Sequence, residues 1–253
     1  MMYTRAIWMP QSCGLVLACR TTALALVLAL ACASEGRAQM TVQEQRFEQL
    51  AATGGFRSHH PDIRWRHLAM SSYRKGDYGK AARRFRKAAL YADKPAQAML
   101  ADMYWNGTGV TSDRSLAHAW MDLAAERAYP DFMEFRTRYW MQLTEAEQAR
   151  ALQLGQGLRR EYGDAVAKPR AELEMRRGRR LVTGSRTGFV AFLDITLVTD
   201  GGQSVRLRGD EYYADEYWKP VTYWRLQDLI WRAPIRERVT VGDLETVDEA
   251  PAR

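Results

Sequence analysis

Histidines and an aspartate are grouped near the start of the helical part of the sequence, where they could form a metal site. His59, His60, Asp62 and His67 supply imidazole and carboxylate groups, which are common ligands of zinc. However, His59, His60 and the proline after them are typical of a loop, and only His67 falls on a predicted helix. We therefore favour surface or helix-capping roles for these residues and predict no metal site.

A second group combines carboxylates with aromatic rings. Asp210, Glu211, Asp215 and Glu216 lie among three tyrosines and a tryptophan, a composition that a sugar-cleaving site could share. Such a site needs two carboxylates at a defined separation across a cleft, so a solvated acidic loop is the favoured interpretation. The segment Gly184–Gly188 lacks the Lys-Ser/Thr ending of a phosphate-binding loop, and no G-x-S-x-G motif occurs. We predict no catalytic residue, no cofactor and no enzyme.

Four arginines form a basic cluster in the second half of the chain. Arg176, Arg177, Arg179 and Arg180 surround Gly178. The cluster could contact anionic lipid headgroups, where each charge near the surface contributes about 1 kcal/mol. It could equally pair with the acidic segment at 210–216 or be solvated. Without the two arginines of the first 33 residues the net charge is +5, which is too small to indicate nucleic acid by itself. We predict no nucleic-acid partner and leave peripheral membrane contact open.

The first 33 residues have the composition of a cleavable export signal. Residues 21–33 read TTALALVLALACA, carry no charge and follow Arg20. A helix of this length reaches about 20 Å, whereas the hydrocarbon core of a membrane is about 30 Å thick. The pattern therefore predicts a signal peptide over residues 1–33, with cleavage as late as residue 38.

The cysteines give this leading segment a second interpretation. Cys13, Cys19 and Cys32 all lie in it, so cleavage would leave no disulfide and no cysteine nucleophile. Residues 28–32, LALAC, loosely resemble a bacterial lipobox, although Ala29 stands where leucine is preferred. The chain is therefore expected to be exported and periplasmic or, alternatively, a membrane-anchored lipoprotein through Cys32. A buried N-terminal helix is the remaining alternative.

Residues 41–165 are predicted to be helical, because proline is scarce and apolar residues recur at helical spacing. The most informative segment is 96–128, which predicts two antiparallel helices joined by a loop. Gly107 and Gly109 permit the chain reversal, since glycine takes positive φ at little cost. Asp113 is placed to cap the second helix.

Residues 96–128, AQAMLADMYWNGTGVTSDRSLAHAWMDLAAERA, resemble a Sel1-like repeat, a relative of the tetratricopeptide repeat. The matching residues stand at fixed offsets: Leu100, Ala101, Tyr104, Gly107, Gly109, Val110, Asp113, Ala117, Trp120, Ala124 and Ala125. The pattern departs from the family at Arg127–Ala128, where glycine usually ends the second helix. The resemblance implies a short α-solenoid of antiparallel helix pairs, in which these residues are packing positions.

An upstream segment repeats part of this pattern. Tyr73 and Gly76 lie 31 residues before Tyr104 and Gly107, and three alanines at 81, 88 and 89 lie 36 residues before their counterparts. Downstream, residues 131–140 and a capping box at 144–147 predict two more helices. The Sel1-like region is therefore predicted at 62–165, as two repeats and a divergent third pair, with an N-terminal helix or linker at 34–61.

After residue 165 the composition changes, and we predict a linker at 164–170 and a small α+β domain over 166–253. Hydrophobic residues alternate over 189–198, residues 200–202 are typical of a hairpin turn, and the return strand begins near Val205. Residues 222–232 are predicted to form a short helix and residues 239–241 a third strand. The tyrosines that precede the helix are predicted to lie in the acidic loop.

Sel1-like proteins are generally adaptors whose stacked helix pairs hold another protein. The resemblance therefore implies an exported adaptor in the bacterial envelope, with a protein or peptide as partner. The alternative is an envelope ligand-binding protein or enzyme whose C-terminal domain holds a sugar or peptidoglycan fragment. A pocket around Tyr212, Tyr217, Trp218 and Trp224 would favour this alternative, whereas burial of the rings in the core would favour the adaptor.

Overall fold

The computed structural model describes residues 42–181 and 193–232, which are mainly helical. The helices are α2 (Val42–Ala51), α3 (Gly54–Arg57), α4 (Pro61–Arg74), α5 (Tyr78–Ala89), α6 (Lys94–Asn106), α7 (Arg114–Ala124), η1 (Ala125–Arg127), α8 (Pro130–Met141), α9 (Glu145–Tyr162), α10 (Asp164–Leu181), α11 (Gly209–Tyr212), α12 (Asp215–Trp218) and α13 (Pro220–Arg232). The strands are β1 (Asp194–Val198) and β2 (Ser204–Arg208). Among the described helices, none combines the length and apolar character needed to cross a membrane.

Four of the predictions fall outside the described residues. They are the signal peptide at 1–33 with Cys32, the glycine segment at 184–188, the beginning of the first strand at 189–192, and the third strand at 239–241.

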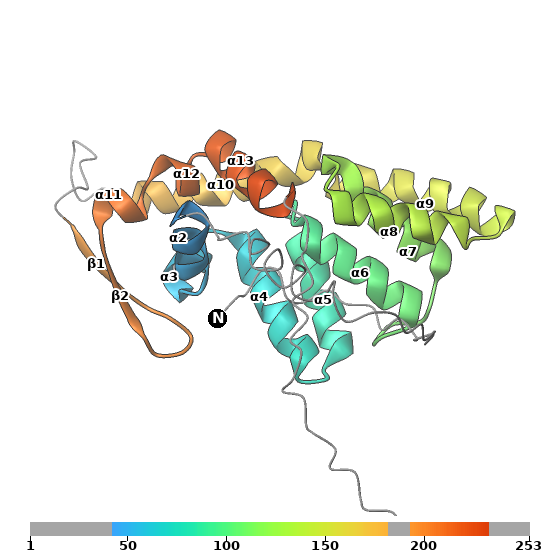
Figure 1. The fold of residues 1–253 in the computed structure, drawn as a ribbon, viewed down its shortest axis with the longest axis horizontal. Helices are drawn as coiled ribbons and strands as arrows, with labels where there is room; N and C mark the ends of the chain where they lie inside the picture. Colours follow the sequence, from blue (N-terminus) through green and yellow to red (C-terminus); the bar gives the residue numbers. More distant parts are fainter. Residues whose placement is uncertain (1–41, 182–192, 233–253) are drawn as a thin grey trace, which may run out of the picture.

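Two helix pairs form the centre of the molecule. α4 packs on α5 and α6 on α7, and contacts between α5 and α6 stack one pair on the next (Figure 1). Each pair is joined by a short turn, so its helices run antiparallel. The second pair begins at Asp93, whose carboxylate accepts a hydrogen bond from the Ala96 N–H, and Pro95 lies in the first turn. This stack confirms the predicted α-solenoid.

The third pair departs from the pattern. α8 and α9 form where the sequence predicts them, and α9 begins with the expected capping box. In that box Thr144 Oγ1 accepts a hydrogen bond from the Glu147 N–H, and the Glu147 carboxylate accepts one from the Thr144 N–H. Both helices, however, pack mainly against α7. They close the stack as two helices that each contact the preceding repeat.

The predicted linker at 164–170 is wrong, because these residues form the first turns of α10. Ala167, Ala171 and Met175 are buried at a spacing of four residues, which gives the helix an apolar stripe despite its many charges and an internal proline. α10 contacts both α4 and α12 (Figure 1). A continuous helix therefore joins the repeats to the C-terminal elements.

β1 and β2 form an antiparallel hairpin, as the alternation predicts. Gly202 in the turn adopts a φ of +76°, which glycine takes without strain. The hairpin is attached to the N-terminal helices, because Thr53 bridges Thr199 and the Arg57 guanidinium holds the Asp200 carboxylate at 2.6 and 2.9 Å. The small sheet is therefore anchored by residues more than a hundred positions earlier in the chain.

The segment after β2 was predicted to be an acidic loop, but it forms the short helices α11 and α12. Its aromatic residues provide the reason. Tyr212, Tyr217 and Trp218 are buried, and the Trp218 indole N–H donates a hydrogen bond to the Tyr212 carbonyl. The acidic residues remain on the outside. Burial of the rings fixes the backbone between them, whereas a solvated loop would leave it free.

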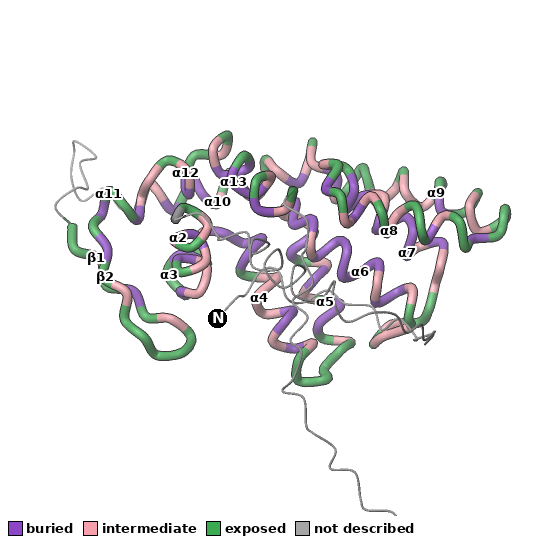
Figure 2. The backbone as a smooth tube through the Cα atoms, viewed as in Figure 1, coloured by how far each residue is buried: buried purple, intermediate pink, exposed green. Residues whose placement is uncertain are grey.

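The described residues form two hydrophobic cores, and Figure 2 shows buried residues along the helices that contribute to both. The repeat core lies between α4 and α8 and is rich in alanine, and it includes Ala81, Phe85, Ala88, Leu100, Ala117, Trp120, Ala124 and Phe132. The aromatic core joins α2–α4 to α10, the hairpin and α11–α13, and it includes Phe47, Phe56, Ala171, Met175, Tyr212, Tyr217, Trp218, Tyr223 and Trp224. The aromatic core thus contains residues from both sides of the boundary predicted at 165/166.

Candidate functional site

The histidines proposed as metal ligands lie in different surroundings. His60 is completely buried, and its ring nitrogens lie 2.9 Å from the Phe56 carbonyl and 2.8 Å from the Tyr217 carbonyl. Burial lowers the pKa of His60 to about 4. His67 instead lies 3.2 Å from the Asp200 carboxylate. His60 therefore ties α3 to α12 inside the aromatic core, which corrects the predicted surface or capping role, and no metal-ligating group of three side chains forms among the described residues.

The rings that could have lined a sugar pocket belong to the core. The exposed fraction is 5% for Tyr212, 2% for Tyr217, 1% for Trp218 and 7% for Trp224. Three of the carboxylates beside them are exposed and lie near basic side chains: Glu211 lies 3.5 Å from Arg46 and Asp215 3.7 Å from Arg179, whereas Asp210 pairs with Arg208 of its own segment. This is the arrangement that favours the adaptor over the ligand-binding alternative.

The arginine cluster at 176–180 is spread around the exposed part of α10. Arg176 pairs with Glu172 at 3.5 Å and Arg177 pairs with Glu174 one turn away. Arg179 lies 3.7 Å from Asp215, so the pairing with the acidic segment that the sequence left open is found for this residue. Exposed pairs of this kind contribute little stability.

The glycine inside this cluster has a packing role. A Cβ at Gly178 would lie 2.5 Å from the His59 ring and 2.6 Å from the Trp218 ring. Only glycine therefore lets α10 approach the aromatic core this closely. The residue that the sequence presented as the centre of a basic cluster is a contact point of the second core.

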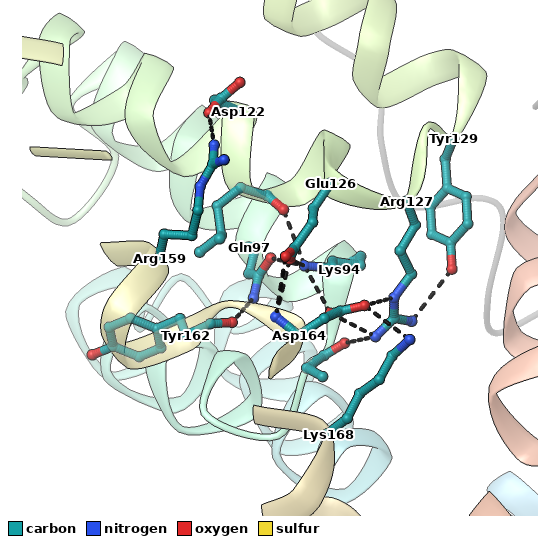
Figure 3. A network of polar contacts seen from close by, with 12 residues as sticks. Lys94, Gln97, Asp122, Glu126, Arg127, Tyr129, Arg159, Tyr162, Asp164 and Lys168 are labelled. Carbon is teal, nitrogen blue, oxygen red and sulfur yellow. Dashed lines mark hydrogen bonds and ion pairs between the residues drawn. The ribbon is translucent and has the colours of Figure 1, made fainter. Parts of the chain in front are cut away.

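A buried polar network that no sequence motif indicated connects the repeats to α10 (Figure 3). The Lys94 side chain at the start of α6 is fully buried, and its ammonium group lies 2.6 Å from the Glu126 carboxylate and 3.0 Å from that of Asp164. The Arg127 guanidinium binds the same Asp164 carboxylate at 2.6 and 3.0 Å. We call Lys94, Glu126, Arg127 and Asp164 the polar junction.

The neighbouring cations keep the Asp164 carboxylate of the polar junction ionised. Burial alone would raise the pKa of Asp164, but the Arg127 guanidinium and the Lys94 ammonium outweigh it and hold the pKa well below its usual range. Burial lowers the pKa of Lys94, and Asp164 and Glu126 oppose this shift. No motif marks these residues, because they come from three separate segments and meet only in the fold.

A narrow recess lies beside the polar junction, between α4, α6 and α13. Asp62 accepts a hydrogen bond from the Tyr223 hydroxyl through one carboxylate oxygen, while its other oxygen and the Gln227 amide nitrogen have no partner among the described protein atoms. The recess has room for about one water molecule, far less than a sugar-sized ligand requires. It is suited to solvating these two groups and does not form a substrate pocket.

The residues of the repeat signature occupy one side of each helix of the second pair. Leu100, Ala117 and Ala124 are fully buried, and Tyr104 and Ala125 are 8% and 4% exposed. The alanines allow the helix backbones to approach closely, as small residues at an interface do.

The signature glycines and aspartate shape the loop between α6 and α7. Gly107 and Gly109 adopt φ values of +70° and +69°. A Cβ at Gly109 would overlap the backbone and Cβ of Tyr78 at the start of α5, so this loop rests directly on the preceding pair. Asp113 caps α7 by accepting a hydrogen bond from the Leu116 N–H at 3.0 Å.

A second repeated feature lies at the ends of α5 and α7. Ala92 and Ala128 adopt φ values of +63° and +53°, and they are the described non-glycine residues with positive φ. They stand 36 residues apart, which is the spacing of the repeated alanines, and Ala128 is where the resemblance expects glycine. Both repeats thus end in the same left-handed residue. The two helix pairs therefore follow one repeated plan, and the residues that carry the resemblance to a Sel1-like repeat hold its packing, loop and capping positions.

Comparison with known proteins finds a partial similarity to one solved structure. No family model and no curated protein matches the chain. Among solved structures, a protective antigen present in uropathogenic Escherichia coli strains and displaying an SLR (Sel1-like repeat) fold is 27% identical, with a TM-score of 0.38. The match covers 47% of this chain and 25% of that protein, so this chain spans about a quarter of its length. A TM-score this low does not establish a shared fold, so the repeated helix pairs rest on the geometry described above.

Proposed function

We propose that this protein is an exported Sel1-like repeat adaptor that mediates protein–protein interaction in the bacterial cell envelope. The main support is the stack of Sel1-like repeats itself. Each repeat buries one side in the repeat core, and solenoid proteins bind partners through the side of the stacked repeats that stays exposed. The signature residues are used for packing, so the exposed residues between them are available for contact.

The aromatic core supports the adaptor over the ligand-binding alternative. The four rings that could hold a sugar are at most 7% exposed, and the recess beside the polar junction is smaller than a ligand site. The C-terminal elements then serve to end the stack and hold its helices in place. Binding would come from complementary surfaces, with no bond made or broken.

The export part of the proposal is supported by the sequence of residues 1–33. A charge-free segment after Arg20 that ends in small residues is typical of a secretory signal. The mature protein would act in the periplasm or, if Cys32 is lipidated, on a membrane of the envelope.

One experiment addresses both parts. The full chain, tagged at its C-terminus, is expressed in a related bacterium, crosslinked mildly and purified from the envelope fraction, and mass spectrometry identifies the mature N-terminus and co-purified proteins. We expect processing after residue 33 or 38, or lipidated Cys32, together with a reproducible protein partner. An unprocessed chain would contradict export. The absence of a partner with folded, processed protein would contradict the adaptor.

A matched pair of surface variants locates the interaction. One variant replaces exposed residues of the repeats, and the other replaces exposed residues of α10, with equal charge removed from each. Both must keep the wild-type melting temperature. Loss of the partner in the repeat variant alone is the expected result, because the repeats provide the proposed surface.

A further inference from the structure

The positive charge of this protein is concentrated in its first Sel1-like repeat. Residues 61–92 contain nine basic and two acidic residues, a balance of +7 that equals the net charge of the whole chain. The second repeat, residues 93–129, contains three basic and five acidic residues. The two repeats share one backbone plan and packing positions, so this difference in charge is not required by the fold.

Three of these basic residues line the exposed side of α5. Lys80, Arg83 and Lys87 follow one another at spacings of three and four residues, and all three are exposed. No described acidic residue lies within ion-pair distance of them. Like charges at this spacing repel and lower the stability of the helix, and no described carboxylate compensates the repulsion. We call these three residues the basic stripe.

The other basic side chains of this repeat that point inward already have structural roles. Arg66 binds the Asp93 carboxylate at 2.6 Å, Arg84 donates to the Leu68 carbonyl at 2.9 Å, and Arg86 donates to the Tyr104 hydroxyl. The basic stripe has no comparable contact, apart from the Lys87 ammonium group 4.3 Å from the centre of the Trp65 ring. Contacts within the fold therefore explain why Arg66, Arg84 and Arg86 are basic. They do not explain the charges of the basic stripe.

We propose that the basic stripe of the first Sel1-like repeat binds an acidic segment of the partner protein. The inference rests on the proposed adaptor function and adds the chemistry of the partner. Three cations in a row on one helix attract a run of carboxylates and speed its association. Trp65, half-buried beside Lys87, offers an aromatic edge at one end of the stripe.

An acidic protein segment fits this surface better than a membrane does. Helices that bind membrane surfaces insert an exposed apolar face into the headgroup region. Five apolar residues of α5 are buried in the repeat core: Ala81, Ala82, Phe85, Ala88 and Ala89. The remaining one, Tyr78 at the first position, is 39% exposed and packs edge-on against Tyr73. A single ring does not give the helix an apolar side that could enter a bilayer.

A nucleic acid fits this surface poorly, because the aromatic rings beside the basic stripe already contact other side chains. Proteins that bind single strands offer open aromatic faces on which bases stack. Here Trp65 has Lys87 at 4.3 Å and Arg64 at 5.5 Å from its ring centre. Tyr78 lies edge-on against Tyr73 with ring centres 5.0 Å apart. The rings beside the stripe are therefore already engaged.

The test measures binding of three anionic probes to the purified full chain. The probes are a fluorescent Glu/Asp-rich peptide, vesicles of phosphatidylglycerol in phosphatidylcholine, and a single-stranded oligonucleotide. The stripe variant is Lys80→Gln, Arg83→Gln and Lys87→Gln, and the matched control is Arg138→Gln, Arg160→Gln and Arg177→Gln, which removes the same charge from exposed positions elsewhere. Both triple variants should melt at nearly the wild-type temperature, because every replaced side chain is exposed.

We expect the peptide to bind the wild type most tightly of the three probes, and the stripe variant to bind it about tenfold more weakly, with little change for the control. Salt should weaken wild-type peptide binding more steeply than that of the stripe variant. Equal weakening of peptide binding in the stripe variant and in the matched control would overturn the proposal, because it would show that the peptide is attracted by net charge alone. Tighter binding to vesicles or to the oligonucleotide would overturn it in favour of those partners.

The same variants in the crosslinking experiment separate this inference from the proposed function. A partner captured by the wild type and equally by the stripe variant would leave the adaptor intact and refute the stripe. No partner for the folded wild type would refute the adaptor, and with it the biological role of the stripe. A partner lost only in the stripe variant, and containing an acidic segment at the crosslink, is the expected result.

Discussion

The repeat core and the aromatic core hold the molecule together in different ways. The repeat core uses small residues, such as Ala88 and Ala124, that let helix backbones pack closely within a unit of about 36 residues. The aromatic core uses large rings, such as Phe56 and Trp218, supplied by segments more than 150 residues apart. Small residues that let two helices pack closely can recur in each repeat of the sequence. A cluster of rings from distant segments, in contrast, forms only when the whole chain folds.

The largest predicted effect compares one glycine from each core. Gly109→Ala should lower the free energy of unfolding by at least about 4 kcal/mol, because it combines positive φ with overlap of the Tyr78 backbone. Gly178→Ala should cost about 3 kcal/mol through overlap with His59 and Trp218. Urea unfolding measures both values. The control is Gly76→Ala, where a Cβ meets nothing within 4 Å, so only the strain of its φ of +78° remains, about 1 kcal/mol.

The polar junction should show the next largest effect, because it lies between the two cores. Asp164→Ala leaves the buried cations Lys94 and Arg127 without their shared carboxylate and should cost about 3 to 4 kcal/mol in chemical denaturation. Lys94→Met should cost less, since Arg127 and Lys168 still pair with Asp164. Equal losses in the two variants would show that the shared carboxylate has no special role.

Acid should weaken the aromatic core through His60. Its pKa is about 4 in the fold against 6.5 for an unperturbed histidine, so the unfolded chain binds the extra proton and stability is lost as pH falls from 6.5 to 4. The advantage of the wild type over His60→Gln should shrink by about 2 to 3 kcal/mol across this window, as measured by urea titrations at each pH. A constant difference would contradict this account.

Asp93 should show the opposite pH dependence of stability in the same urea titrations. Burial raises its pKa from 3.8 to about 6, so its contribution is greatest below pH 3.8 and is lost as pH rises to about 6. The advantage of the wild type over Asp93→Asn should therefore grow on acidification. The asparagine can still cap α6, which keeps the structural change small.

A stabilising variant should come from the end of the second repeat. Ala128→Gly should raise the free energy of unfolding by about 0.5 to 1 kcal/mol, because Ala128 is exposed and holds a φ of +53°. Thermal unfolding is the measurement. Ala149→Gly, exposed within α9 at ordinary helical φ, should instead destabilise by about 1 kcal/mol. If both changes destabilise, the left-handed residue carries no strain.

The smallest effect should come from the exposed arginines of α10. Arg176→Gln removes a 3.5 Å pair with Glu172 on the helix surface and should change stability by less than about 0.5 kcal/mol. Circular-dichroism melts would detect a larger effect, which would mean that Arg176 has a role beyond this pair.

The sequence predicted the repeats well because their structure is determined locally. Gly107, Gly109 and Asp113 act within one loop, and each has a residue type that its position requires. The charged composition of residues 164–180 concealed the stripe of Ala171 and Met175 that makes α10 a core helix. The polar junction could not be predicted, because Lys94, Arg127 and Asp164 have no fixed spacing and meet only after the helices pack.

Helix α10 has a consequence for how this protein unfolds. Solenoids commonly lose their terminal repeats one at a time, since each repeat touches only its neighbours. Here one helix is tied at Asp164 to Lys94 and Arg127 of the repeats and passes at Gly178 against Trp218. Neither end of the stack can fray without disturbing the same helix. The described part of the chain should therefore unfold in a single cooperative transition, with coincident curves for helix content and tryptophan fluorescence.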